Sequence, residues 1–351
     1  MASEAAARAS TWRRIYPFEI AAALVVASAV IFLRAQGLRI DWHTVGYTIP
    51  PMLPITGKAL LAGIPLVLLY RALSRQSLRG YLREVASFSW LQLWARLWIS
   101  YMAITYAYFW LKVSVPLVHW RVFDPEAWRL DTLLHLGVSP SVFMVNLLAG
   151  TPLLRWLDVW YGLWLKTVFY SIAFFSAFPD PVLRRRLMLS SVLIWGLGAW
   201  IYTAFPVLGP IYAYRQQWAA VEGQMPIAEG TQAMLAENYA RVVAGRDGTL
   251  RAFNPTRGVA AMPSLHVGVL WLLMLFALRY ARPLFLFFAL ATAATFVGAL
   301  ATGWHYAIDI YVGIALAQLC YWLACRLEVE PEAGGEATGV AAGGSAPPSS
   351  L

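Results

Sequence analysis

Two histidines and one aspartate are the side chains of this sequence best suited to catalysis. His266 lies in the segment GVAAMPSLHVG and His305 in the segment GWHYAIDIYVG. Asp309 follows His305 by about one helical turn. A carboxylate paired with an imidazole fixes the tautomer of that ring and makes its second nitrogen a better nucleophile. The pattern predicts phosphoryl transfer, in which His305 attacks phosphorus, Asp309 orients His305, and His266 donates and accepts the proton.

The elements that must position these residues are membrane helices. The chain has 351 residues, of which 60% are hydrophobic and 13% are charged, and a soluble protein rarely has this composition. A helix needs about 20 apolar residues to cross a bilayer. We therefore predict an all-α, polytopic membrane bundle of about eight transmembrane helices. The predicted helices span residues 17–36, 57–73, 95–116, 157–178, 187–205, 264–281, 283–301 and 305–326.

This topology brings the two histidines to the same membrane depth. His266 begins the sixth predicted helix, and His305 begins the eighth after the chain has crossed the membrane and returned. Short arginine-rich loops mark the cytoplasmic side of a membrane protein. We therefore expect cytoplasmic termini and an exoplasmic active site, in the cell membrane. The arginines that define this side lie at 8–14, 71–83, 184–186 and 279–282.

A serine and three cations near the histidines are candidates for binding a phosphate. Pro263 fits the first position of a helix, so the N–H groups that follow it would point out of a helix N-terminus, which attracts anions. A lysine inside a membrane helix needs a partner or a ligand. Structural alternatives are open: Lys112 can snorkel to the interface, and Lys166 can pair with Asp158. The predicted phosphate-binding residues are Ser264, Lys112, Lys166 and Arg257.

The two histidine segments together resemble a known pair of motifs. MPSLHVG and GWHYAIDIYVG are similar to the second and third signature motifs of the type 2 phosphatidic acid phosphatase superfamily. The segments YAYFWLKVSVPLVHWRVFDPEAWRLDTLLHLGVSP and YTAFPVLGPIYAY resemble the branch of inositol phosphorylceramide synthases, which are inositolphosphotransferases. The resemblance covers roughly residues 100–326. It implies a six-helix catalytic core, a phosphohistidine intermediate, and the same roles for His305, His266 and Asp309.

The chain departs from the phosphatases of that superfamily in its cationic motifs. It lacks a Lys-x6-Arg-Pro motif, and Gly298-Ala299 stands where those phosphatases have a Ser-Arg pair. Both absences resemble the phosphotransferase branch. The leading hypothesis is therefore a membrane phosphotransferase that moves a phosphoryl-alcohol head group, with phosphoinositol as one candidate. The alternatives are a lipid-phosphate phosphatase, in which water resolves the same intermediate, and a non-catalytic transporter or scaffold.

Four regions are expected along the chain. The segment EGTQAMLAENYARVVAG has helical spacing of its apolar residues, which predicts an amphipathic helix on the membrane surface and a possible lid. The regions are a cytoplasmic segment at 1–16, an accessory transmembrane hairpin and loop at 17–87, the catalytic core at 88–327 with an exoplasmic loop at 206–262, and a disordered tail at 328–351.

No metal, cofactor or nucleic acid is expected. The histidines and Asp309 already have roles, and no cysteine or further acid lies near them in the sequence. Basic residues cluster between apolar runs, which indicates membrane topology and not nucleic-acid binding. The expected partners are the bilayer and a phospholipid or other lipid-phosphate substrate, and the oligomeric state is left open.

Overall fold

The computed structural model of the chain describes residues 15–38, 42–245 and 254–328. Within these ranges the chain forms helices and loops but no strand. The long helices are α2 (Pro17–Ala35), α3 (Trp42–Leu73), α5 (Phe88–Val118), α8 (Pro152–Ser176), α9 (Pro181–Ala204), α12 (Leu265–Tyr280), α13 (Phe285–Ala301) and α14 (Ala307–Leu327). All eight predicted helices are therefore present, and α3, α5, α8 and α9 begin earlier than the predicted apolar runs.

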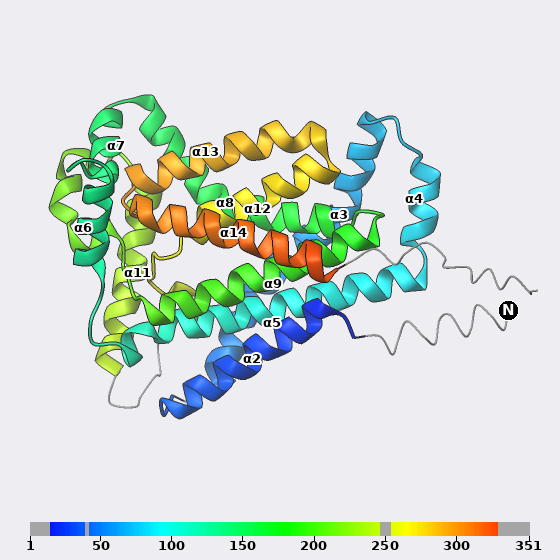
Figure 1. Ribbon diagram of the computed structural model, residues 1–351, viewed down its shortest axis with the longest axis horizontal. Coiled ribbons are helices and arrows are strands. Elements are labelled where there is room, and N and C mark those ends of the chain that lie inside the picture. The colour runs from blue at the N-terminus through cyan, green and yellow to red at the C-terminus, as the bar shows by residue number, and fades with distance from the viewer. Residues whose placement is uncertain (1–14, 39–41, 246–253, 329–351) are drawn as a thin grey trace, which may run out of the picture.

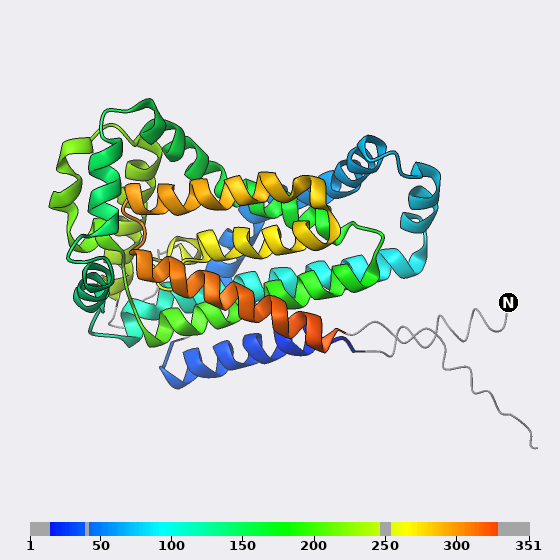
Figure 2. The ribbon, with the colours of Figure 1, turned by 45° about the horizontal axis from the view of Figure 1, so that its top comes forward.

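Shorter helices connect the long ones. They are α4 (Leu78–Val85), α6 (Asp124–Leu134), α7 (Pro140–Leu148), α10 (Pro210–Ala213), η1 (Arg215–Val221), α11 (Pro226–Ala244), η3 (Pro255–Arg257) and η4 (Arg282–Leu284). The helix α11 contains the predicted amphipathic segment. Figures 1 and 2 show the long helices side by side, with α6, α7 and α11 at one end of the bundle and α4 at the other.

Helix starts follow ordinary capping rules. Ser87, Ser139, Thr151 and Asp180 each accept a backbone N–H at the start of a helix. Proline occupies the first turn of α2, α6, α7, α8, α9 and α11, where its missing N–H would have had no helical partner. Local sequence therefore helps to determine where α2, α5, α8 and α9 begin.

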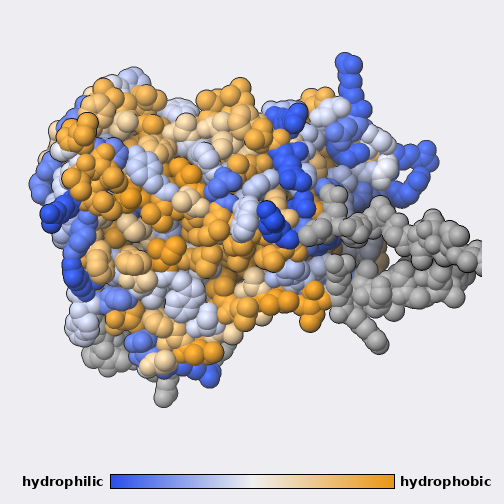
Figure 3. Space-filling view, viewed as in Figure 1, coloured by the Kyte–Doolittle hydropathy of each residue, from blue (hydrophilic) through white to orange (hydrophobic). Residues whose placement is uncertain are grey.

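The described helices form an all-α membrane bundle. Five described segments are long and apolar enough to cross a bilayer: Pro17–Ala35, Thr56–Leu73, Pro181–Ala204, Arg282–Ala301 and Ala307–Leu327. The helix α12 is apolar but shorter. Apolar side chains cover most of the middle of the surface in Figure 3, and hydrophilic side chains gather toward its ends.

The most buried span, α9, packs against α2, α5, α12 and α14. The backbones of α12 and α14 approach each other very closely where they begin. A Cβ atom on Gly313 would lie 2.3 Å from the carbonyl oxygen of Ser264, so only glycine fits there. This close approach fixes the two helices that carry the predicted catalytic residues.

The predicted terminal segments lie mostly outside the described residues. Arg8, Arg13 and Arg14 are among those outside, as is the expected disordered tail from residue 329 onward. Glu328 was predicted to belong to that tail. It is instead 3% exposed, and its carboxylate accepts a hydrogen bond of 2.8 Å from Arg185. The ordered chain therefore continues through Glu328, because its charge has a buried partner.

Candidate active site

The structure brings His266 and His305 into direct contact. His266 lies in the first turn of α12, and His305 lies in the loop between α13 and α14. Nδ1 of His266 is 3.1 Å from Nε2 of His305. The ring of His266 also packs against the rings of Tyr161 and Trp164, with centroid distances of 4.9 and 4.3 Å. Two aromatic side chains of α8 thus hold the first histidine against the second.

The carboxylate of Asp309 lies close to the Nδ1 side of the His305 ring. Its Oδ2 is 3.6 Å from Nδ1 of His305 and accepts the backbone N–H of Tyr306 at 2.9 Å. The predicted helix start at residue 305 is two residues early, because α14 begins at Ala307. Asp309 therefore reaches His305 as a capping residue that folds back over the helix N-terminus, and not along the side of a continuous helix.

A second acid, Asp131 of α6, holds the start of α14. Its carboxylate accepts the backbone N–H groups of Ala307 at 3.1 Å and Ile308 at 2.9 Å. Asp131 is 1% exposed, and burial raises the pKa of its carboxyl group while these hydrogen bonds oppose that shift. The negative charge also matches the positive end of the helix dipole. The position of Asp309 therefore depends on a side chain from a distant part of the sequence.

Asp124, at the first position of α6, fixes the loop beside the histidines. It accepts the backbone N–H groups of Leu208 and Gly209, each at 2.9 Å, and the hydroxyl of Tyr306 at 3.0 Å. Gly209 has a φ of +113°, a conformation that favours glycine. Sequence reasoning missed Asp124 and Asp131, because each acts on a segment far away along the chain.

Ser264 caps α12, but it does not present a free backbone donor. Its N–H donates to the carbonyl oxygen of Asp309 at 2.8 Å, and the helix begins one residue later at Leu265. The backbone N–H of Ser264, one of the two expected donors, is therefore already occupied. The Oγ of Ser264 is buried and has no hydrogen-bond partner among the described residues.

A cavity of about 360 Å³ opens at the histidines, between α5, α8, α11 and the segment that follows η3. Lys112 and Arg257 line it together with His266 and His305. The Nζ of Lys112 lies 5.2 Å from the ring centre of Tyr202. The structure thus places two of the three predicted cations in the same cavity as the two histidines.

The third predicted cation, Lys166, lies elsewhere. Its side chain is exposed on α8 and does not line the cavity. Asp158 is not its partner either, because both carboxylate oxygens accept backbone N–H groups at the start of α11, from Ile227 at 3.0 Å and from Ala228 at 2.7 Å. Asp158 lines the cavity and holds α11 over it.

Two further donors in the cavity were not predicted. The hydroxyl of Tyr161 and the Nε1 of Trp304 are buried, line the cavity, and have no hydrogen-bond partner among the described residues. Buried donors are usually satisfied in proteins, so unpartnered ones beside a cavity are suited to a ligand. The position of Trp304 directly before His305 is a sequence signal that could have indicated a donor in the cavity. Nothing in the sequence around Tyr161 indicates such a donor.

A site for a resident metal is not evident in the part of the chain that the structure describes, where no three metal-ligating side chains come together. What the cavity offers is an imidazole with a carboxylate 3.6 Å from it, a second imidazole in contact with the first, and two cations. These groups suit attack on a phosphorus atom that carries negatively charged oxygens.

Comparison with known proteins points to the same chemistry. A family model described as PAP2 superfamily matches residues 125–323, which extend from α6 into α14. No curated protein and no solved structure matches the chain. The matched region contains both histidines and Asp309, whereas Lys112 lies before it.

Proposed function

Because the chain belongs to the PAP2 superfamily, we propose that it is an integral-membrane lipid phosphotransferase, which moves a phosphoryl-alcohol head group from a phospholipid to a lipid or polyol acceptor. Membership of this superfamily supports, in general terms, a phosphatase or phosphotransferase function on lipid phosphates. The observation that carries the proposal is the contact of 3.1 Å between His266 and His305 at a cavity that Lys112 and Arg257 also line.

In the first half of the proposed reaction, Nε2 of His305 attacks the phosphorus of the donor lipid. The bond from phosphorus to the lipid oxygen breaks, and His266 donates its proton to that oxygen. Asp309 stabilises the positive charge that develops on the ring of His305. The contact between the two histidines must open at this stage, since phosphorus and the leaving oxygen have to lie between them.

In the second half, a hydroxyl group of the acceptor attacks the phosphohistidine. His266 takes the proton of that hydroxyl, a new bond forms from oxygen to phosphorus, and the bond from phosphorus to His305 breaks. Lys112 and Arg257 neutralise the phosphate oxygens in both halves. Tyr161 and Trp304 supply hydrogen-bond donors to the phosphate or to the head group.

Two features of the structure favour transfer over hydrolysis. His305 is only 2% exposed, and α11 lies over the cavity, which limits the entry of water. A second cavity of about 590 Å³ lies on the other face of α11, and Tyr212 lines both cavities. This second cavity has room for part of another substrate. We assign phosphoinositol as the candidate head group from the resemblance of the sequence motifs, and α11 as the lid that shapes acceptor choice.

The test is a product analysis in lipid nanodiscs. The purified full chain is incubated with phosphatidylinositol that is radiolabelled in its phosphate, with and without ceramide, and all labelled products are separated. We expect a labelled new lipid that requires both ceramide and His305, so that His305→Ala produces none. Labelled inositol phosphate or inorganic phosphate alone, lost in His305→Ala, would instead indicate a hydrolase. Products unchanged by His305→Ala would contradict catalysis at this site.

A further inference from the structure

A further cavity lies at the opposite end of the bundle from the histidines. It has a volume of about 220 Å³, and residues at the starts of α5 and α9 line it together with the residue that precedes α2. Arg96, Arg184 and Arg185 line it, together with the aromatic side chain of Trp90 and the amide of Gln92. The proposed reaction uses none of these residues.

The arginines of this cavity differ in how their charges are balanced. Arg96 donates to Glu19 at 2.7 Å, and Arg185 donates to Glu328 at 2.8 Å. Arg184 is 1% exposed and makes no ion pair among the described residues. Its contacts are the backbone carbonyl of Trp90 at 3.2 Å and the ring face of the same residue at 4.4 Å. Glu84 interacts electrostatically with this guanidinium but forms no ion pair with it, so the buried charge is balanced only in part and favours a further anion.

Unpartnered donors surround the same cavity. The Nε of Arg184, the Nε1 of Trp90 and the Nε2 of Gln92 are buried and have no acceptor among the described residues. All three residues line the cavity. Glu84 lines it too, but its carboxylate forms no ion pair with Arg184. Three buried donors around a positive charge that is balanced only in part match a group with several negatively charged oxygens, and a phosphate is such a group.

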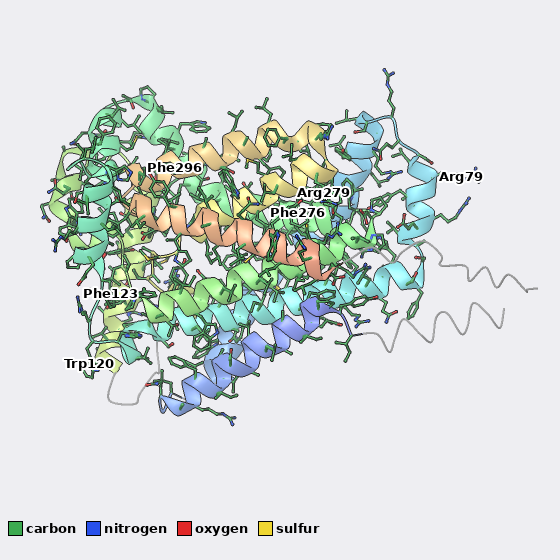
Figure 4. All side chains as sticks on the ribbon, in the orientation of Figure 1. Arg79, Trp120, Phe123, Phe276, Arg279 and Phe296 are labelled. Carbon is green, nitrogen blue, oxygen red and sulfur yellow. The ribbon has the colours of Figure 1, made fainter. Side chains whose placement is uncertain are left out.

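The surroundings identify the source of that phosphate as a lipid. Trp90 and Trp94 stack at 5.7 Å near the start of α5, and tryptophan is typical of the membrane interface. Arg79 and Arg279, labelled in Figure 4, also lie toward this end. Basic pockets between transmembrane helices on the positively charged side of a protein bind anionic head groups. We propose that the cavity at Arg184 binds the phosphate of an anionic phospholipid in the leaflet opposite to the active site.

This lipid would be a structural ligand, and its binding does not depend on the proposed function. The lipid would join α5 to α9, since Trp90 and Gln92 belong to α5 and Arg184 belongs to α9. The active site lies at the other end of the same two helices.

The test compares lipid binding between charge-matched variants. All proteins carry His305→Ala so that no lipid is consumed, and native mass spectrometry measures retained phosphatidylglycerol against phosphatidylcholine. We expect the parent protein to retain phosphatidylglycerol preferentially and Arg184→Gln to lose that preference by about ten-fold or more. Arg79→Gln, which removes an exposed arginine from the same end, should retain it. If both variants lose the preference for phosphatidylglycerol, or if neither variant loses it, the proposal is overturned.

A second variant covers the case in which Arg184→Gln does not fold. Gln92→Leu removes one donor and no charge, and it should reduce the rise in melting temperature that phosphatidylglycerol produces in the parent protein. An undiminished rise in Gln92→Leu would count against the site. Inorganic phosphate alone should give no such rise in detergent, and an equal rise would show a site for free phosphate and overturn the assignment to a lipid.

Discussion

Lys112 lies in α5 and Lys166 in α8, yet only Lys112 shares a cavity with the histidines. Lys112 packs against the rings of Tyr108 and Tyr202, and no ion pair involves it in the described part of the chain. A cation held in this way has its charge available for a ligand. The two lysines therefore form a natural pair of test and control.

Replacement of Lys112 by methionine should lower the rate of head-group transfer by about 10²-fold or more, because it removes one of two cations that stabilise charge on the phosphate oxygens. Lys166→Met should leave the rate within about two-fold of the parent protein, since its side chain is exposed and outside the cavity. Initial rates in nanodiscs measure both. Equal losses in the two variants would refute the assignment of Lys112.

Asp309→Asn should lower the rate by about 10³-fold to 10⁴-fold while the protein remains folded, because the amide cannot stabilise a positively charged His305. The amide oxygen can still accept the N–H of Tyr306, which preserves the start of α14. Initial rates and melting temperatures test this together. A variant with normal activity would show that Asp309 is only a structural cap.

At the scale of elements, a buried carboxylate on one helix fixes the start of another helix at two places in the described chain. Asp131 of α6 caps α14, and Asp158 of α8 caps α11. The first cap positions the residues that would do the chemistry, and the second positions the helix that covers the cavity. Both use a buried carboxylate from a distant segment.

Asp131→Asn should destabilise the protein by about 1–3 kcal/mol, because it weakens two charge-assisted hydrogen bonds that are buried. The transfer rate should fall as well, since the first turn of α14 carries Asp309. Glu126→Gln on the same helix is the control, because Glu126 is exposed and pairs with Arg121 at the surface. Thermal unfolding in nanodiscs compares the two, and equal stability would argue against the capping role.

The sequence predicts the long helices well, because apolar runs and capping residues are local signals. It also predicts that His266 and His305 meet, since the membrane limits how two spans and a turn can be arranged. It does not predict the contacts of Asp131 or Asp124, which join segments far apart along the chain. The expected backbone donor of Ser264 fails for the same reason, because Asp309 approaches from another helix and accepts its N–H.

The molecule as a whole has two polar ends that differ in chemistry. The end with α6 and α11 holds the histidines, and the end with α4 holds the arginine cavity. Arg79 and Trp120, labelled in Figure 4, mark the two ends. On the proposed topology the first end is exoplasmic and the second is cytoplasmic.

Cysteine labelling in intact cells tests this orientation. In a background with alanine at Cys320 and Cys325, Trp120→Cys should react with a membrane-impermeant maleimide, whereas Arg79→Cys should react only after the cells are opened. Both positions are exposed in the structure, so burial does not explain a difference in labelling. The reverse pattern would place the histidines on the cytoplasmic side.

The last helix joins both ends of the molecule. His305 and Asp309 lie at or near its start, and Glu328 at its end binds Arg185 and Arg186 of α9. A ribosome adds these residues after the other helices that the structure describes. A nascent chain that stops before residue 305 has no nucleophile, and one that stops before residue 328 leaves two arginines without their partner. On the proposed function, a nascent chain therefore cannot cleave membrane lipids before the ribosome has added His305.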